Sequence, residues 1–486
     1  MRKCSLRNHF IWVLFAAAVV FTYNPASAKN KFVYDQLLKA DRGGYQLTPV
    51  GLCEDYPEET TTLDIIRADM ELLKRSDVKF LRISFGWDGI ETAKDQYNWG
   101  FWDDFVKIAV DDYGITLIPY ICYTPRWNST GDSLNFWNHT PADYDEFGEF
   151  MGDLVNRYKD RIHSWELWNE PDIDAFWSGN AADLAKLTKI GSKAIREADP
   201  EAIVVLGGIA WDVKFLEEVF KIHEISPYVD VVNCHNYFET WHNGPIEDII
   251  PYVNEVQNII DKYGDKQSLW MAEVGYSTWR MTENMVSHHY TAYYDYEHTF
   301  DFQAVQIFRT LTMLYATEKM DAIAWYEIKD LPMGEDVIGD NNNRNLGVAE
   351  IDHTAKPGEK TLRFFNSLLG KKYKVNSDLQ LSGSVHPSLH FHTFDLADGS
   401  TVAVAWFQTA EYSKREEDSS GQVKDTRVTD LSIMLDSDYS RAELFTATGE
   451  SRGEIPIEKR GWLKKNYSVN GIALVGGDIM ILKLSK

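Results

Sequence analysis

Between Tyr45 and about Gly370, the chain alternates short apolar segments with segments whose apolar residues recur at helical spacing. This alternation is typical of βα units arranged around a parallel sheet. Eight such units follow one another, with strands expected at 47–52, 78–85, 115–123, 164–172, 202–206, 229–237, 268–273 and 322–327. They predict a closed (β/α)8 barrel, the TIM barrel of the α/β class, with its active site on the loops that follow the strands.

The helix before the fourth strand has the clearest pattern in the chain. Its apolar residues recur every three or four positions and form one stripe: Phe147, Phe150, Met151, Leu154, Val155 and Tyr158. Such a stripe predicts a helix that covers one face of a sheet. A second long helix is expected over 302–317, just before the eighth strand.

Beyond Gly370 the pattern changes to alternating segments that are broken by Asp-Gly, Thr-Gly and Gly-Gly turns, with no helix-length stripe. This texture predicts an antiparallel β-sandwich. We therefore expect a catalytic barrel over residues 29–370 and an accessory sandwich over residues 371–486. Because no low-complexity linker separates the two, the sandwich is expected to dock against the barrel.

The first 28 residues have the composition of a secretory signal peptide. Arg2, Lys3 and Arg7 precede an apolar run over 11–21, and Ala26-Ser27-Ala28 offers a small-residue cleavage site. The run is too short to span a bilayer comfortably. We expect an exported protein, periplasmic or extracellular, with no integral membrane segment after the signal is cleaved.

Composition narrows the choice of partner. A net charge of −25 argues against nucleic acid or an anionic membrane surface. An aromatic content of 13%, with 16 tryptophans, suits a cleft that stacks on sugars, although core packing explains any single tryptophan. Cys53, Cys122 and Cys234 lie in apolar strand-like segments without metal-ligand spacing, so buried thiols are expected.

The stretch from Ser164 to Asp172, Ser-Trp-Glu-Leu-Trp-Asn-Glu-Pro-Asp, carries the strongest chemical signal. Pro171 cannot donate to a sheet ladder and favours an extended Glu170, so a buried strand ends with a displayed carboxylate. By strand alternation Glu166, Trp168 and Glu170 share one face. Carboxylates on the inner face of a buried strand are costly, which makes chemistry the better explanation.

A second apolar strand, 268–273, also ends in a carboxylate. By alternation Glu273 shares its face with Leu269 and Met271 and points inward. Two carboxylates about 5–5.5 Å apart would provide the nucleophile and the acid/base of a retaining glycosidase. For Glu273 alone, the alternative is a carboxylate that caps the helix after the strand. The presence of Glu170 at the end of another strand makes this alternative less favoured.

Two more strands carry polar residues that support the same site. Alternation places His235 and Tyr237 on one face at the end of the sixth strand. Arg82 lies among apolar residues of the second strand and has to pair with a carboxylate: Glu273, which it would keep ionised, or Glu166 as a structural partner. For His235 alone, a hydrogen-bonded core histidine is an equal alternative.

The run Glu-Leu-Trp-Asn-Glu-Pro at 166–171 resembles the strand-4 signature of the large clan of retaining glycoside hydrolases with a (β/α)8 barrel, clan A. The resemblance implies that Glu170 is the acid/base and that Asn169 holds the sugar 2-hydroxyl. It also implies that Glu273 is the nucleophile. His235-x-Tyr237 is similar to the clan's His-x-Tyr, whose tyrosine hydrogen-bonds the nucleophile.

Aromatic residues extend the resemblance. Trp325 on the eighth strand matches the clan's aromatic floor under the sugar, and alternation leaves open whether it or Tyr326 faces inward. Trp127 and Tyr276 are candidate stacking platforms in the loops. Within the clan the sequence is most similar to glycoside hydrolase family 39, whose members pair a barrel with a β-sandwich, while family 5 is also possible.

These observations together predict a retaining glycoside hydrolase. It is expected to cleave the O-glycosidic bonds of an oligo- or polysaccharide by double displacement, without a cofactor or a metal. The bonds are expected to be β-linked. The alternative is a carbohydrate-binding barrel without turnover. Such a protein would not need two opposed carboxylates.

Overall fold

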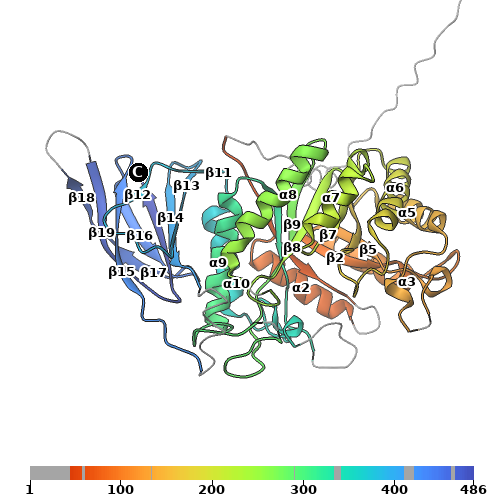
Figure 1. Ribbon diagram of the computed structural model, residues 1–486, viewed down its shortest axis with the longest axis horizontal. Coiled ribbons are helices and arrows are strands. Elements are labelled where there is room, and N and C mark those ends of the chain that lie inside the picture. Colours follow the sequence, from red (N-terminus) through yellow and green to blue (C-terminus); the bar gives the residue numbers. More distant parts are fainter. Residues whose placement is uncertain are drawn as a thin grey trace, which may run out of the picture.

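The structure is a computed structural model that describes residues 44–56, 61–132, 134–242, 244–288, 290–332, 341–409, 421–460 and 466–486. The predicted signal peptide lies outside these residues. Within them, a barrel, a sandwich of two sheets and a small hairpin account for the strands. Figure 1 shows the sandwich beside the barrel, with helices α9 and α10 between them.

Parallel strands close into a barrel in the order β1-β10-β9-β8-β7-β6-β5-β2. The strands are β1 (Val50–Glu54), β2 (Phe80–Gly86), β5 (Thr116–Cys122), β6 (Ser164–Asn169), β7 (Ile203–Ile209), β8 (Val231–Asn236), β9 (Ser268–Val274) and β10 (Met320–Trp325). The hairpin β3 (Glu91–Ala93) and β4 (Gln96–Tyr97) follows the short helix α3 (Trp87–Ile90). The predicted TIM barrel is confirmed.

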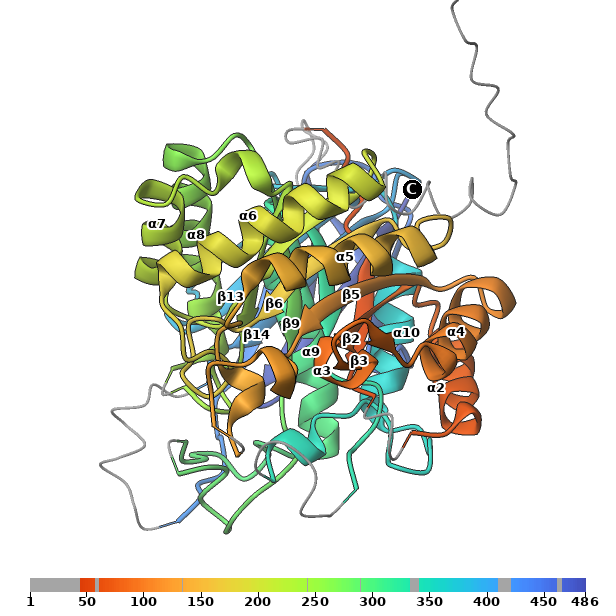
Figure 2. The same ribbon diagram turned by 90° about the vertical axis from the view of Figure 1, so that its right-hand side faces the viewer.

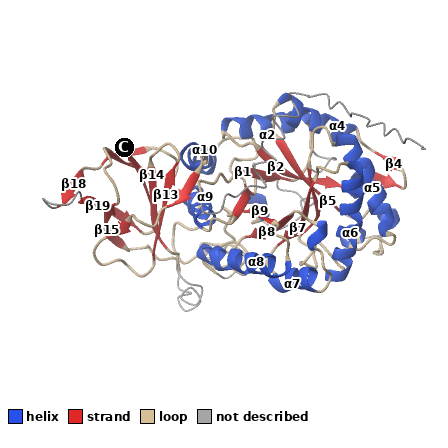
Figure 3. Ribbon diagram, turned by 90° about the horizontal axis from the view of Figure 1, so that it is seen from above, coloured by secondary structure: helices blue, strands red, loops and turns tan. Residues whose placement is uncertain are grey.

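Helices surround the barrel (Figure 3). They are α2 (Leu63–Arg75), α4 (Gly100–Val106), α5 (Tyr144–Tyr158), α6 (Ala181–Ala198), α7 (Val213–Lys221), α8 (Ile249–Tyr263), α9 (Phe300–Ala316) and α10 (Pro357–Leu369). Helices α5 and α6 lie on the side of the barrel away from the sandwich (Figure 2).

Helix α5 confirms the stripe that its sequence predicts, because all six apolar residues of the stripe are buried. Its first turn is capped by Asp143, whose side chain accepts from the backbone N–H of Asp145. The cap fixes where the helix begins, and the apolar stripe packs it into the core. The chain then leads directly into β6, the strand that precedes Glu170.

Side chains inside the barrel and side chains between the barrel and its helices form separate clusters. The inner cluster draws on the strands and the loops after them but on none of the helices: Cys53, Phe80, Ile118, Ile203, Val205, Val231, Tyr237, Trp270, Ala272, Ala322, Ala324, Tyr326 and Leu346. The outer cluster joins strands to helices. Membership of these clusters shows which way a strand residue faces. Cys53, Cys122 and Cys234 are buried thiols, as predicted.

The C-terminal part is an antiparallel sandwich of a sheet β11-β13-β14-β20-β16-β17 and a sheet β12-β15-β19-β18. Its strands are β11 (Tyr373–Val375), β12 (Gln380–Leu381), β13 (Leu389–Leu396), β14 (Thr401–Phe407), β15 (Val428–Leu435), β16 (Arg441–Phe445), β17 (Ser451–Glu454), β18 (Ile457–Arg460), β19 (Asn466–Val475) and β20 (Ile479–Ser485). The predicted sandwich is confirmed, and its first sheet shares the outer hydrophobic core of the barrel.

Buried polar contacts fix the sandwich to the loop that follows β8. Glu247 in this loop pairs with Arg309 of α9 and accepts from the indole N–H of Trp406 in β14 at 2.8 Å. The hydroxyl of Thr409 donates to Glu239 in the same loop. Because this loop also carries Tyr237, the sandwich helps to hold one wall of the site described below.

None of the helices in the described ranges is long and apolar enough to cross a membrane.

Candidate active site

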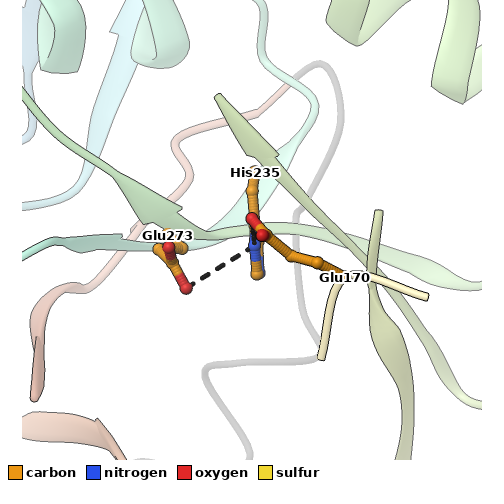
Figure 4. A group of neighbouring side chains, drawn as sticks. All are labelled: Glu170, His235 and Glu273. Atoms are coloured by element: carbon orange, nitrogen blue, oxygen red, sulfur yellow. Dashed lines mark hydrogen bonds and ion pairs between the residues drawn. The ribbon is translucent and has the colours of Figure 1, made fainter. Parts of the chain in front are cut away.

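Two glutamates from barrel strands that are separated by β7 and β8 meet at the C-terminal ends of their strands. An oxygen of Glu170, after β6, and an oxygen of Glu273, in β9, lie within 4.8 Å of each other and of His235 Nδ1. Figure 4 shows His235 beside both carboxylates, with Nδ1 2.9 Å from Glu170 Oε1 and 3.5 Å from Glu273 Oε2. The structure therefore brings together the pair that the sequence singled out.

Glu273 reaches the interior through a β-bulge, and the alternation argument for it is wrong. Leu269 and Met271 belong to the outer cluster, whereas Trp270 and Ala272 belong to the inner one. Strand β9 holds one extra residue against both neighbours, because Trp270 pairs with Asn233 but Glu273 pairs with His235, and the β10 register shifts at the same place. The extra residue shifts the alternation, so Glu273 points inward despite its place in the sequence.

Strand β6 also departs from alternation. Trp168 has φ +84° and lies in the outer cluster, with its indole N–H donating to the carbonyl of Phe176 at 3.1 Å. Strand alternation predicts that Trp168 shares the inner face with Glu166, and this prediction is wrong. The left-handed conformation lets Asn169 contact Arg82 inside the barrel instead. Glu170 is left-handed too, with φ +44°. Such strain in non-glycine residues costs about 1–3 kcal/mol each and is concentrated at functional sites.

Arg82 bonds both of the carboxylates that the sequence offered as alternative partners. Its Nε and one terminal nitrogen donate to Glu166 at 2.8 and 2.9 Å, and its other terminal nitrogen donates to Glu273 at 2.8 Å. A further bond of 2.7 Å reaches the side-chain oxygen of Asn169. The hydroxyl of Tyr237 donates to the second oxygen of Glu273 at 2.6 Å. Arg82 and Tyr237 thus fix Glu273 from both sides.

Asn233 and Gly208 complete the site, and the sequence analysis did not single them out. The oxygen of Asn233 accepts from Ala272 N–H at the bulge, at 2.9 Å, and its nitrogen lies 3.2 Å from His235 Nε2. This network assigns Nε2 as an acceptor and leaves the proton on Nδ1, facing Glu170. A Cβ at Gly208 would stand 2.0 Å from His235 Nε2, so only glycine leaves room for this imidazole. The Gly207-Gly208 pair in β7 was the available sequence signal.

Electrostatics separates the two glutamates. Burial and the nearby Asp172 raise the pKa of Glu170 to about 8. Burial and the nearby Glu170 raise the pKa of Glu273, while the Arg82 guanidinium and the Tyr237 hydroxyl oppose the rise. Because Arg82 and Tyr237 both donate to Glu273, the proton that the pair shares at neutral pH resides on Glu170. Burial lowers the pKa of His235, which keeps its imidazole neutral.

The aromatic residue that faces the interior after β10 is Tyr326. Trp325 is fully buried in the outer cluster, so its predicted place under a sugar is wrong. Tyr326 belongs to the inner cluster, and its hydroxyl donates to Asp55 at 3.2 Å. The hydroxyl of Tyr120 also donates to Asp55, which adds a third, half-buried carboxylate that the sequence analysis missed.

The two predicted loop platforms differ in accessibility. Tyr276 is only 1% exposed and stacks on His298 with ring centroids 4.4 Å apart, so it packs inside its own loop and offers no face to a sugar. That prediction is wrong. Trp127 is half-buried after β5, with its indole N–H on the carbonyl of Glu91 at 2.8 Å, and its role stays a prediction.

Glu170, His235 and Glu273 are also the group of side chains in the described ranges that could ligate a metal ion. The protein's own donors already engage these atoms: Arg82 and Tyr237 bond Glu273, and His235 Nδ1 bonds Glu170. The expectation of a reaction without a metal stays a prediction.

Two buried glutamates face each other at the strand ends of this TIM barrel, and an arginine and a tyrosine hydrogen-bond one of them. This arrangement has the form of a glycoside hydrolase. Residues 46–298, just over half of the chain, match the sequence model of the family Cellulase (glycosyl hydrolase family 5). The protein belongs to this family and is a glycosidase. Family 5 was the second family that the sequence left open, and the predicted clan is confirmed.

Solved structures give the same fold. A family 39 glycoside hydrolase from the gut symbiont Bacteroides cellulosilyticus WH2 is similar with a TM-score of 0.65 and 16% identity, over 93% of this chain and 82% of that one. A monomeric β-xylosidase from Caulobacter crescentus CB15 is similar with a TM-score of 0.62 and 16% identity, over 91% of this chain and 97% of that one. A family 30 endoxylanase from Clostridium papyrosolvens C71 is similar with a TM-score of 0.58 and 13% identity, over 91% of this chain and 98% of that one. The predicted likeness to family 39 is thus confirmed in the fold. No curated protein matches the sequence.

Proposed function

We propose that this glycosidase cleaves O-glycosidic bonds, β-linked, of an oligo- or polysaccharide with retention of anomeric configuration. The observation that carries this proposal is the approach of the two carboxylates to within 4.8 Å. Retaining enzymes hold their carboxyl groups about 5–5.5 Å apart, whereas inverting enzymes leave about 6.5–9.5 Å for a water molecule. A pair this close fits the spacing of retaining enzymes and supports direct attack of one carboxylate on the sugar.

In the proposed mechanism, Glu170 protonates the glycosidic oxygen while Glu273 attacks the anomeric carbon and the bond to the leaving oxygen breaks. The glycosyl ester is then hydrolysed by water that Glu170, now a base, deprotonates. The raised pKa of Glu170 suits the first step. Once Glu273 is esterified its negative charge is gone, so the pKa of Glu170 falls and the base form becomes available.

The remaining site residues have supporting roles in this proposal. Asn169 would hold the sugar 2-hydroxyl, and His235 contacts both glutamates. Tyr237 and Arg82 orient Glu273, and Trp127 lines the rim. Export to the periplasm or the cell exterior would bring the enzyme to its polysaccharide. A screen for reducing sugar released from xylan, mannan, swollen cellulose and bacterial exopolysaccharide, with products identified by mass spectrometry, would define the substrate. A barrel that binds these polymers without turnover would release none.

The first product is expected to keep the anomeric configuration of the bond that is cleaved, since two inversions at one carbon restore it. Proton NMR at high enzyme concentration would record the first anomer before mutarotation. An inverted first product would contradict the two-step mechanism.

Replacing Tyr237 by phenylalanine is expected to lower kcat by roughly 10–1000-fold, because Glu273 loses its shortest hydrogen bond while the ring and its packing stay. The melting temperature should change little. Tyr252→Phe is a matched control, since this buried tyrosine donates to the carbonyl of Ile209 at 3.0 Å and touches neither glutamate. Equal losses in both variants would assign Tyr237 to stability rather than to the nucleophile.

A further inference from the structure

Asp55 follows β1 on the face of the barrel that carries the glutamates, and no motif of the sequence analysis includes it. Its two carboxylate oxygens accept from tyrosine hydroxyls on two other parts of the barrel. Oδ1 accepts from Tyr120 in β5, and Oδ2 accepts from Tyr326, which follows β10, at 3.2 Å. The carboxylate is therefore held in one orientation by groups that lie far apart in the sequence.

This carboxylate keeps acceptor capacity that the protein does not use. An ionised carboxylate offers about four acceptor positions, two on each oxygen. Among the described residues, the two tyrosines are the side-chain donors to Asp55, and each engages a different oxygen. Because Asp55 is only half-buried, each of its oxygens can accept a second hydrogen bond from a molecule in the pocket.

The same two tyrosines connect this carboxylate to the groups around the candidate nucleophile. The guanidinium of Arg82 lies over the ring of Tyr120, 4.2 Å from its centroid. The ring of Tyr326 meets that of Tyr237 edge-on, with centroids 6.4 Å apart. Arg82 and Tyr237 are the residues that hydrogen-bond Glu273. The carboxylate of Asp55 thus borders the pocket in which the sugar is attacked.

The order of the strands places Asp55 across this pocket from the reacting bond. Glu273 lies in β9 and Glu170 follows β6, with β8 and β7 between them. In the closed ring of eight strands, β1 and β2 lie opposite β7 and β8. A pyranose with its anomeric carbon at the glutamates turns the opposite carbon, C4, toward β1. With its 2-hydroxyl at Asn169 after β6, C3 lies next to C4 on the same side.

We propose that Asp55 accepts hydrogen bonds from the 3- and 4-hydroxyls of the sugar that Glu273 attacks, and so selects a neutral sugar with both hydroxyls free. This inference rests on the proposed function. Two neighbouring hydroxyls match the two oxygens of a carboxylate with a fixed orientation, and bonds to a charged acceptor are the stronger ones. A uronate or a phosphorylated sugar would bring a second negative charge beside Asp55, so such sugars are rejected.

The test combines one substitution in the enzyme with one deletion in the sugar. Aryl β-glycosides of gluco, xylo, manno and galacto configuration first identify the sugar that the wild-type enzyme prefers. Asp55→Asn is expected to lower kcat/KM on that glycoside by roughly 10–100-fold, because a neutral amide replaces the charged acceptor. On the 3,4-dideoxy analogue, wild type and variant should agree within about threefold, since the hydrogen bonds in question are absent from both complexes.

Two further variants accompany this comparison. Tyr326→Phe leaves the carboxylate in place but removes one of its donors, so it should show the same pattern with a smaller loss. Asp103→Asn is the matched control. Asp103 is also half-buried and also accepts from a tyrosine, Tyr158 at 2.9 Å, but it lies on α4 outside the barrel. Its kcat/KM should equal that of the wild type on both sugars.

Three results would overturn the assignment of Asp55. Equal losses on the glycoside and on its dideoxy analogue would leave Asp55 as a strut between Tyr120 and Tyr326. An unchanged kcat/KM in Asp55→Asn would remove any role in recognition. The third is a wild-type enzyme that cleaves only chains in which the attacked sugar is substituted at O4, which would still be a glycosidase. No turnover of any glycoside or oligosaccharide would instead overturn the proposed function.

Discussion

Glu273→Gln is expected to lose nearly all turnover, at least about 10⁴-fold, on every substrate, because an amide cannot form the glycosyl ester. Substrate binding should persist, since glutamine keeps the size of the side chain and can still contact Tyr237. The measurement is kcat on aryl glycosides together with binding of a cleavable oligosaccharide by calorimetry.

Glu170→Gln is the matched control for this result. With aryl glycosides whose leaving groups need no protonation, its first step should remain fast, and azide should accelerate breakdown of the trapped intermediate. Azide should not rescue Glu273→Gln in the same way. If the two variants lose activity equally on all substrates and azide rescues neither, the assignment of nucleophile and acid/base is wrong.

Arg82→Met is the second change with a large expected effect, on stability and on pH dependence alike. The guanidinium is buried and bonds Glu166 and Glu273. Removing one partner of a buried ion pair typically costs about 3–5 kcal/mol of unfolding free energy, because the remaining charge is left without compensation. The melting temperature should fall, and the folded variant should turn over more slowly.

The pH profile separates this role from a purely structural one. Arg82 holds down the pKa of Glu273, so its loss raises that pKa and Glu273 becomes protonated at a higher pH. The acidic limb of kcat/KM should therefore move to higher pH. The basic limb depends on Glu170 keeping its proton, and activity should fall as the pH rises through its pKa of about 8.

Arg309→Met provides the control for Arg82. Arg309 is also buried and also pairs with a buried glutamate, Glu247, but it lies on α9, where Glu247 also bonds Trp406 of the sandwich. We expect a comparable loss of stability with an acidic limb that stays in place. An acidic limb that is equally unmoved in folded Arg82→Met would leave Arg82 as a structural partner of Glu166 alone.

Local pattern was sufficient for the architecture. Eight apolar segments with helical stripes between them define a barrel, since strand and helix periodicity are properties of neighbouring residues. The pairing of Glu170 with Glu273 also followed from the sequence, because both end apolar strands and all strand ends of a closed barrel meet at one face. His235 and Tyr237 share the inner face, as plain alternation in β8 requires.

The orientation of single side chains was decided by the tertiary structure. The bulge in β9 and the left-handed Trp168 in β6 each break the period of two, and both depend on contacts with neighbouring strands that no local pattern contains. Asn233 satisfies the N–H that the bulge exposes, and Gly208 leaves room for His235. For the same reason alternation could not choose between Trp325 and Tyr326, and it could not show that Tyr276 packs inside its loop. The sequence by itself determined which strands carry the chemistry, whereas packing between strands determined which atoms meet.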